Sequence, residues 1–384
     1  MATKELTENR YLITHEVGPN RLGPRGTRLD HFLKEHYQHR SREKLKKDID
    51  SGTVKLVRSS KAYAPVGRLK PSLQLMPGDE IQILTLRRPE RPVCFDYKIL
   101  FEDEDVFVIE KPANLPVHPS GKYFFNTLLI HLRTEGFKNP LRMNREYFLV
   151  HRIDKETSGI LVLAKNKETC AHLMNQFAVR STEKYYFAIV YGITPEHFMV
   201  NRPLMRSPDS MIRLKMKVAS ENEKGLTAET VFKRLENSSQ FSLLECRPKT
   251  GRQHQIRVHL ESAGFPIVGD KLYGIPEAEA LRFYDRSILT AEAQAKLLLP
   301  RHALHSAEIQ LTHPKTGKKM VFHSKLPNDL REFIHTHFNL NSSPLLSDLA
   351  KSNVPPTTAR GRERLDTTGN ENNRVSTTPK PVQA

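Results

Sequence analysis

The chain has 384 residues, of which 38% are hydrophobic, and a formal net charge of +17 at pH 7. This length accommodates one large domain and a smaller one, and the positive charge favours a polyanionic partner, because binding releases counterions from phosphates. Residues 1–17 lack the apolar core of a signal peptide, and the chain lacks an apolar run of the ~18 residues that cross a bilayer. We therefore expect a cytoplasmic protein without a membrane partner.

The three cysteines, Cys94, Cys170 and Cys246, lie far apart in the chain. Their spacing fits neither a zinc site nor a disulfide framework. An odd number of thiols suits a reducing compartment, which agrees with the expected location.

The first 86 residues divide into a short polar extension, residues 1–24, and a compact basic unit, residues 25–86. In the basic unit the apolar spacing predicts two helices, the second after an N-cap at Ser41, followed by strands at 53–57 and 73–86. Ten Lys or Arg stand against five Asp or Glu between Arg25 and Arg58. This excess favours a nucleic-acid partner.

The basic unit resembles the small αL-type RNA-binding module of ribosomal proteins and RNA-modifying enzymes. The resemblance implies that its helices sit on structured RNA. It rests on these stretches: Arg28-Leu29-Asp30-x-Phe32-Leu33, Ser41-Arg42, Ile49-x-x-Gly52-x-Val54 and Leu75-x-x-Gly78-Asp79-x-Ile81.

The rest of the chain divides into three parts. Residues 87–96 contain two prolines among alternating charges and predict a linker that acts as a hinge. Residues 97–340 predict one α+β domain. Residues 341–384 are rich in Ser, Thr, Asn and Pro and predict a disordered tail.

The large domain is expected to be mostly antiparallel, because its strands are joined by turns and hairpins. A buried strand is predicted at 160–164, followed by an amphipathic helix at 167–179 with Cys170, Met174, Phe177 and Ala178 on its apolar face. Residues 275–300 predict an insertion with its own helix. Further strands are expected at 99–100, 106–110, 184–191, 227–236, 241–247, 302–311 and 319–323, and helices at 126–133 and 250–260.

The strongest chemical signal is the polar loop that feeds the strand at 160–164. Its His151-Arg152-Ile153-Asp154 is not a kinase catalytic loop, because one residue separates Arg152 from Asp154 and no glycine-rich phosphate loop precedes it. A metal site is also disfavoured, because His151, His254 and His259 have no thiol or carboxylate partners at ligand spacing.

Two other stretches supply plausible partners for Asp154. Tyr186 lies on a predicted strand, and residues 250–259 supply Arg252 and Arg257. An arginine near Asp154 would keep that carboxylate ionised, and an ionised carboxylate acts as a nucleophile or stabilises a sugar cation. Each residue alone also has a structural interpretation, but their coincidence in one basic domain favours a site.

A long motif runs through this loop: His151-Arg152-Ile153-Asp154-x-Glu156-Thr157-Ser158-Gly159, followed by Leu161-x-Leu163-Ala164-Lys165. On this central match, residues 97–335 resemble the RluA-type pseudouridine synthases. Other matching stretches are Lys111-Pro112-Ala113-x-Leu115-Pro116-Val117-His118-Pro119, Lys184-x-Tyr186-x-Ala188-x-Val190-x-Gly192, Thr250-Gly251-Arg252-x-His254-Gln255-Ile256-Arg257-Val258-His259, Gly264-x-Pro266-Ile267-x-Gly269-Asp270-x-x-Tyr273-Gly274 and Pro300-Arg301-x-Ala303-Leu304-His305.

The resemblance implies a pseudouridine synthase fold and the isomerisation of uridine to pseudouridine in RNA, without cofactor or metal. It implies that Asp154 is the nucleophile, that Tyr186 packs on the uracil and that Arg257 orients Asp154. Arg152 would occupy the space that a flipped nucleotide leaves. We place His151, Lys165 and Arg252 with Arg152 as substrate-binding residues, and we expect a monomer.

Large-subunit ribosomal RNA is the favoured substrate, because structured RNA suits the N-terminal module, and transfer RNA is the alternative. A different class of function, a non-catalytic RNA-binding or ribosome-assembly factor, remains open. A nucleoside or sugar hydrolase would need a second carboxylate, for which Glu156 is the nearest candidate.

Overall fold

The computed structural model describes residues 2–7, 10–17, 27–37, 41–57, 68–86, 90–120, 123, 125–138 and 146–339. The chain divides into two compact units. The first comprises the residues up to 181 together with 312–319, and the second comprises 182–311 and the residues from 320 on. The tail predicted at 341–384 lies outside the described residues. Each unit is described by itself below.

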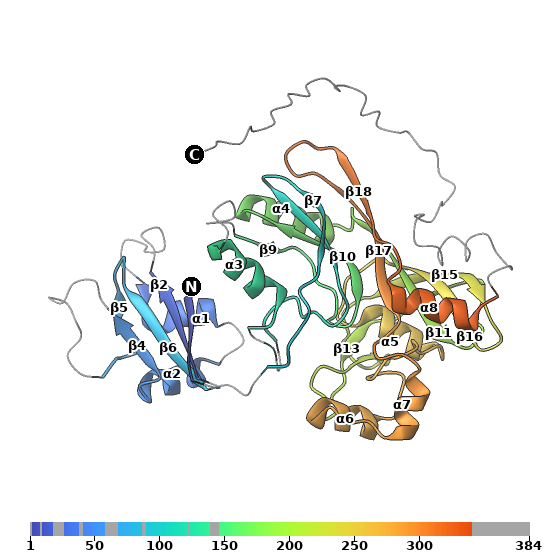
Figure 1. The fold of residues 1–384 in the computed structure, drawn as a ribbon, viewed down its shortest axis with the longest axis horizontal. Coiled ribbons are helices and arrows are strands. Elements are labelled where there is room, and N and C mark those ends of the chain that lie inside the picture. The colour runs from blue at the N-terminus through green and yellow to red at the C-terminus, as the bar shows by residue number, and fades with distance from the viewer. Residues whose placement is uncertain are drawn as a thin grey trace, which may run out of the picture. The chain divides into compact units, whose positions relative to one another are not determined.

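The first unit begins with a four-stranded antiparallel sheet in the order β1-β2-β6-β4, with two helices packed on it (Figure 1). A short pair, β3 with β5, lies apart from this sheet. The elements are β1 (Ala2–Thr7), β2 (Arg10–Glu16), β3 (Thr27–Arg28), α1 (Leu29–His36), α2 (Arg42–Asp50), β4 (Val54–Val57), β5 (Gln74–Leu75) and β6 (Glu80–Leu86). Their shared core contains Leu29, Phe32, Leu45, Ile49 and Ile81.

Residues 2–7 and 10–16, which belong to the stretch that we expected to be a polar extension, instead form strands β1 and β2 of this sheet. Ile13 and Val17 join the core of the module, and His15 points inward with them. His15 is tolerated there because its Nε2 lies 2.9 Å from the Tyr37 hydroxyl. Because the inward-facing residue His15 is polar, this stretch does not show the alternation of apolar and polar residues that predicts a strand.

The rest of the first unit contains helices and antiparallel strands in the order β10-β8-β7, with β9 paired to β10. Ala164 of β10 faces Val106 of β8, and Gly159 faces Lys111. Every residue of β10 is buried, as its apolar run predicts. The elements are β7 (Lys98–Glu102), β8 (Val106–Lys111), α3 (Leu128–Lys138), β9 (Phe148–Leu149), β10 (Ser158–Ala164) and α4 (Lys167–Ala178).

The segment 90–96, part of the predicted hinge, is packed against the start of α3. The Glu90 carboxylate accepts hydrogen bonds from the backbone amides of Phe125 and Asn126. The Phe95 ring stacks on the His131 ring with 4.0 Å between the centroids. These contacts restrain the part of the linker that the structure describes.

Helix α4 forms where predicted, with Asn166 as its N-cap, but its buried face is not the expected one. Thr169, Leu173 and Gln176 are buried, whereas Met174 is 52% exposed. Gln176 is buried because its amide exchanges two hydrogen bonds with the backbone of Thr312. Polar residues that find such partners are invisible to apolar spacing.

The second unit contains an antiparallel sheet in the order β12-β15-β16-β11-β17, and β18 pairs with β17. Phe241 at the start of β16 packs edge-on against Phe333 of α8. The elements are β11 (Glu183–Tyr191), β12 (His197–Asn201), β15 (Glu229–Asn237), β16 (Phe241–Pro248), β17 (Leu304–Thr312), β18 (Lys319–His323) and α8 (Asn328–His337).

A small subdomain of the second unit joins a two-stranded arm, β13–β14, to three helices (Figure 1). The elements are β13 (Leu204–Arg206), β14 (Met216–Val218), α5 (Gln255–Ser262), α6 (Glu277–Arg286) and α7 (Ala291–Leu297). Leu204, Val258, Leu272, Ala280 and Leu297 share one apolar core. The insertion predicted at 275–300 therefore carries two helices, and it packs on the arm and on α5.

The strand pairs described in both units are antiparallel, and helices accompany the sheets. The predicted α+β class is therefore confirmed. Among the described residues, none of the helices is both long and apolar enough to cross a membrane.

Candidate active site

His151 anchors the start of the polar loop to the buried strand that follows it. Its Nε2 accepts a hydrogen bond from the backbone amide of Val162, 2.9 Å away. Its ring stacks on Phe177 of α4 with 4.9 Å between the centroids. The imidazole therefore fixes the loop, and this contact favours a structural role for the histidine that we expected to bind substrate.

Lys111 fixes the same loop from β8, and its side chain is fully buried. Its ammonium donates to the carbonyl oxygens of Pro112 at 2.8 Å, Leu115 at 3.1 Å and Lys155 at 3.0 Å. One cation thus ties the loop at 112–116 to the loop that carries Asp154. The sequence signal was a lysine at the end of a buried strand, and we had assigned it no function.

Asp154 and Arg152 are residues of this loop for which the sequence predicted a nucleophile and a substrate contact, respectively. Asp154 is half-buried and Arg152 is exposed. The Asp154 carbonyl accepts a hydrogen bond from the Thr157 amide at 3.1 Å, which closes a turn. Arg152 Nη1 lies 3.3 Å from Nε2 of His118. Burial, and secondly the Arg152 charge, lower the pKa of His118, so this imidazole stays neutral at pH 7.

Lys165, which we expected to bind substrate, is engaged inside the first unit. Its ammonium lies 3.1 Å from the Glu102 carboxylate and also donates to the Asp103 carbonyl. Only 10% of its side chain is exposed. These contacts support a role in holding the end of β10 rather than in binding RNA.

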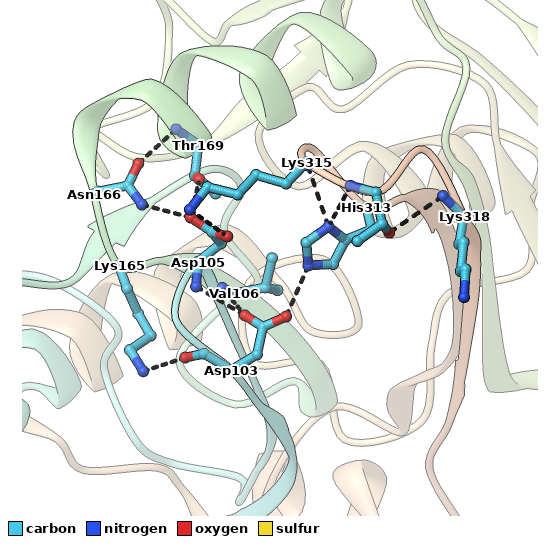
Figure 2. Close-up of polar contacts among 10 residues, drawn as sticks. Asp103, Asp105, Val106, Lys165, Asn166, Thr169, His313, Lys315 and Lys318 are labelled. Atoms are coloured by element: carbon cyan, nitrogen blue, oxygen red, sulfur yellow. Dashed lines mark hydrogen bonds and ion pairs between the residues drawn. The ribbon is translucent and has the colours of Figure 1, made fainter.

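Asp103, Asp105 and His313 are the ligand-type residues in the described chain that lie close enough together to hold a metal ion. Figure 2 shows that protein groups already occupy their ligand atoms. Asp103 accepts from two backbone amides and lies 2.7 Å from His313 Nε2. Asp105 accepts from Asn166 and Thr169 and pairs with Lys315 at 3.2 Å. The cluster therefore fastens the 312–319 turn to the β7–β8 turn.

Tyr186 lies on β11 in the second unit, between Cys246 of β16 and Ser306 of β17. The register with β17 slips between Tyr185 and Tyr186, and such irregularities re-aim side chains near active sites. Lys184 lies on the same strand, two residues before Tyr186.

Lys184 begins the matching stretch that contains Tyr186, but the sequence predicted no role for it. Burial lowers the pKa of its ammonium to about 8. Its Nζ donates to the Thr250 carbonyl at 3.3 Å, which ties β11 to the loop that precedes α5.

The loop at 250–254 is held by the Gln255 side chain at the start of α5. Gln255 Oε1 accepts from the Thr250 hydroxyl at 2.6 Å and from the Arg252 amide at 3.0 Å. Its Nε2 donates to the Glu229 carbonyl and the Thr230 hydroxyl, both at 2.9 Å. Arg252 is half-buried and its Nε donates to the Thr227 carbonyl at 3.1 Å. The Nε end of the Arg252 guanidinium, a predicted RNA contact, is therefore held in place.

Arg257 forms an ion pair that the sequence did not reveal. Its Nε and Nη2 donate to the two oxygens of Asp270 at 2.7 and 2.9 Å. Both side chains are buried, with 5% of Arg257 and none of Asp270 exposed. Burial alone would raise the pKa of Asp270, but Arg257 and the amides of Leu272 and Tyr273 outweigh it and lower the pKa. Arg257 and Asp270 are therefore both charged.

The predicted site residues are distributed over the two units. The first unit holds His151, Arg152, Asp154 and Lys165 around one loop, and the second holds Tyr186, Arg252 and Arg257. The expected pairing of Arg257 with Asp154 would join the units, and it stays a prediction.

Comparison with known proteins identifies the class. Residues 105–262 match the model of the family described as RNA pseudouridylate synthase. An uncharacterised RNA pseudouridine synthase of Aquifex aeolicus is 33% identical over 317 residues, which cover 79% of this chain and 92% of that protein. Ribosomal large subunit pseudouridine synthase D of Zymomonas mobilis is 36% identical over 315 residues, which cover 80% and 92%.

A further relative, ribosomal large subunit pseudouridine synthase C of Buchnera aphidicola, is 30% identical over 325 residues, covering 80% of this chain and 93% of that protein. The protein is thus an RNA-modifying isomerase. The chain belongs to the RNA pseudouridylate synthase family, as its motifs predicted.

Proposed function

We propose that this enzyme converts uridines of large-subunit ribosomal RNA to pseudouridine and that Asp154 is its nucleophile. The observation that carries the proposal is the placement of Asp154 in a loop fixed by His151 and Lys111, directly before the wholly buried strand β10. A half-buried carboxylate on a rigid loop is suited to attack a bound nucleotide. Relatives named as large-subunit synthases support the choice of RNA.

In the proposed reaction, the N1–C1′ bond of uridine breaks, the base turns, a C5–C1′ bond forms, the C5 proton leaves and N1 takes up a proton. Asp154 attacks the ribose anomeric carbon or the uracil ring, or it assists cleavage through a glycal-like intermediate. Arg152 is exposed and occupies the place of the flipped nucleotide. Tyr186 packs on the uracil near the C5 proton, and Arg257 orients Asp154.

The N-terminal module is proposed to dock on the RNA outside the reacting nucleotide. Helix α2 exposes Arg42, Lys44, Lys46 and Lys47 on its surface. Cations on a helix face bind phosphates and release counterions, so the affinity should fall steeply with salt. We further propose that the enzyme acts as a cytoplasmic monomer.

The test compares the wild-type chain with Asp154→Asn and Glu156→Gln on ribosomal RNA labelled with tritium at uracil C5. We expect tritium release from the wild type and Glu156→Gln, and a loss of at least about 10³-fold for Asp154→Asn. Asp154→Asn should keep its fold and its affinity for RNA. Wild-type release by Asp154→Asn would refute the nucleophile, and free uracil as the product would indicate a hydrolase.

The substrate is tested by mapping pseudouridines across the transcriptome of cells with and without the gene. Loss of sites confined to large-subunit ribosomal RNA is the expected result. Loss of sites in transfer RNA would overturn the proposed substrate, and rescue of a deletion phenotype by Asp154→Asn would favour a non-catalytic assembly factor.

A further inference from the structure

The turn of residues 269–274 holds Arg257 from two sides. Asp270 receives both Nε and Nη2 of Arg257, and two parallel bonds fix the plane of a guanidinium. The Tyr273 ring lies 5.0 Å from the guanidinium carbon and supplies a cation–π contact. The two Asp270 bonds engage Nε and Nη2 of the guanidinium, and Nη1 takes no part in them.

The glycines of this turn are needed for its shape. Gly269 has a φ of +77°, and a Cβ there would lie 2.0 Å from the Arg301 carbonyl oxygen. A Cβ on Gly274 would lie 2.7 Å from the Asp270 carbonyl oxygen. The Asp270 carboxylate also accepts from the amides of Leu272 and Tyr273 at 2.9 and 3.1 Å. The turn therefore presents its carboxylate and its aromatic ring as one rigid piece.

The Tyr273 hydroxyl connects this piece to two other elements. It accepts a hydrogen bond from the Met216 amide at 3.0 Å, on the arm strand β14. It also lies 2.9 Å from His254 Nδ1, and the two rings meet edge to face. His254 precedes α5 in the left-handed conformation, with φ of +55°. One hydroxyl thus joins the arm, the start of α5 and the support of Arg257.

We propose that Asp270 and Tyr273 are positioning residues for pseudouridine formation. Asp270 orients Arg257, and the Tyr273 hydroxyl couples this orientation to the docking of the arm on α5. This inference rests on the proposed function, in which Arg257 orients Asp154. It follows that loss of either residue slows the chemical step while the binding of RNA stays nearly unchanged.

The test uses Asp270→Asn and Tyr273→Phe with matched controls. Tyr273→Phe keeps the ring over Arg257 and removes only the hydroxyl, so it folds even where Asp270→Asn does not. Tyr191→Phe is its control, because the Tyr191 hydroxyl binds the Lys296 carbonyl on α7. Asp329→Asn controls for Asp270, because Asp329 receives Nε and Nη2 of the buried Arg301 at 2.6 and 3.0 Å.

At saturating RNA, we expect the single-turnover rate of tritium release to fall about tenfold for Tyr273→Phe and about 10²-fold for Asp270→Asn, since small misplacements at a site have this effect. The Kd for RNA should stay within about twofold of the wild type. The controls should lose stability with unchanged rates. Rates of Asp270→Asn and Tyr273→Phe that equal those of their controls, at matched folded fraction, would overturn the inference.

Hydrogen exchange at Arg257 Nε–H, followed by ¹⁵N NMR, separates this inference from the proposed function. Slow exchange in the wild type and fast exchange in Asp270→Asn are expected, whether or not the enzyme releases tritium. Absence of tritium release by the wild type, with slow exchange retained, would refute the proposed function and leave the orientation of Arg257 by Asp270 standing. Equal exchange in both proteins would refute the positioning role alone.

Discussion

The loop at 151–158 and the turn at 269–274 both surround charged side chains, but they hold them in different ways. In the loop the fixed atoms belong to the His151 ring, which accepts from the Val162 amide, and to the backbone carbonyl of Lys155, which accepts from Lys111. In the turn the fixed atoms are the charges themselves, because Asp270 and Arg257 are buried against one another.

This difference separates stability from chemistry in the two regions. A loop that is held by such contacts can have its exposed charged side chains substituted with little change in folding free energy. A buried ion pair cannot lose one partner without leaving the other charge unpaired in a medium of low dielectric constant. Charged side chains can therefore be removed from the first region with little effect on folding, whereas their removal from the second region also destabilises the fold.

The largest expected effect contrasts two arginines. Arg257→Leu leaves Asp270 buried and unpaired and should lower the free energy of unfolding by about 3–5 kcal/mol. Arg152→Leu, at an exposed position, should change it by less than about 0.5 kcal/mol. Urea denaturation of both variants measures the two losses. Similar losses would show that folding depends on the charged side chains of the loop as much as on those of the turn.

Sequence patterns predicted the elements whose burial is apolar. The run at 160–164 became β10, and the segment predicted at 184–191 became β11, because both are short apolar strands. The patterns failed where polar groups are buried with hydrogen-bond partners. His15 hid a strand, and Gln176 turned the buried face of α4 away from Met174.

The site shows the same division. The motif at 151–159 predicted a polar loop entering a buried strand, and the structure has that arrangement. The partner of Arg257 was not predictable from spacing, since Asp270 reaches it only through a tight turn 13 residues later. The role of Lys111 depends on carbonyls from two loops, which become neighbours only in the folded chain.

The second largest effect is a pH dependence that originates in the second unit. His305 is fully buried, and burial lowers its pKa to about 4, compared with 6.5 in an unfolded chain. The unfolded state therefore binds more protons than the folded state between these pH values. The stability that the neutral, buried His305 contributes above pH 6.5 is lost as the pH falls to 4. This loss amounts to about 3 kcal/mol.

His305→Gln keeps a donor for the Ser324 carbonyl, which His305 Nε2 approaches to 3.2 Å. The free energy of unfolding of this variant, measured from pH 4 to 7, should vary less than that of the wild type by the same amount. Parallel curves for the two proteins would show that His305 does not account for the acid sensitivity.

Lys111→Met tests how much the Lys111 ammonium contributes to the stability of the loop region. The substitution removes the donor of three carbonyls and should cost about 2 kcal/mol, with a lower rate of tritium release because the loop of Asp154 loosens. Lys98→Met is the control, because Lys98 is exposed and pairs with Glu110 at 3.5 Å. If Lys111→Met is as stable as Lys98→Met, the three hydrogen bonds of Lys111 do not determine the stability of the loop.

The smallest effect concerns the charge that Arg152 places beside His118. Arg152→Ala removes a guanidinium 3.3 Å from His118 Nε2, and the pKa of His118 should rise because that charge disfavours its protonation. Burial, the larger cause, remains, so the pKa should still lie below 6.5. NMR titration of the imidazole measures the change, with Lys155→Ala as a control in the same loop. An unchanged pKa in Arg152→Ala would mean that Arg152 does not rest on His118 in solution, and its side chain would then be held less firmly for an RNA than the Arg257 guanidinium is.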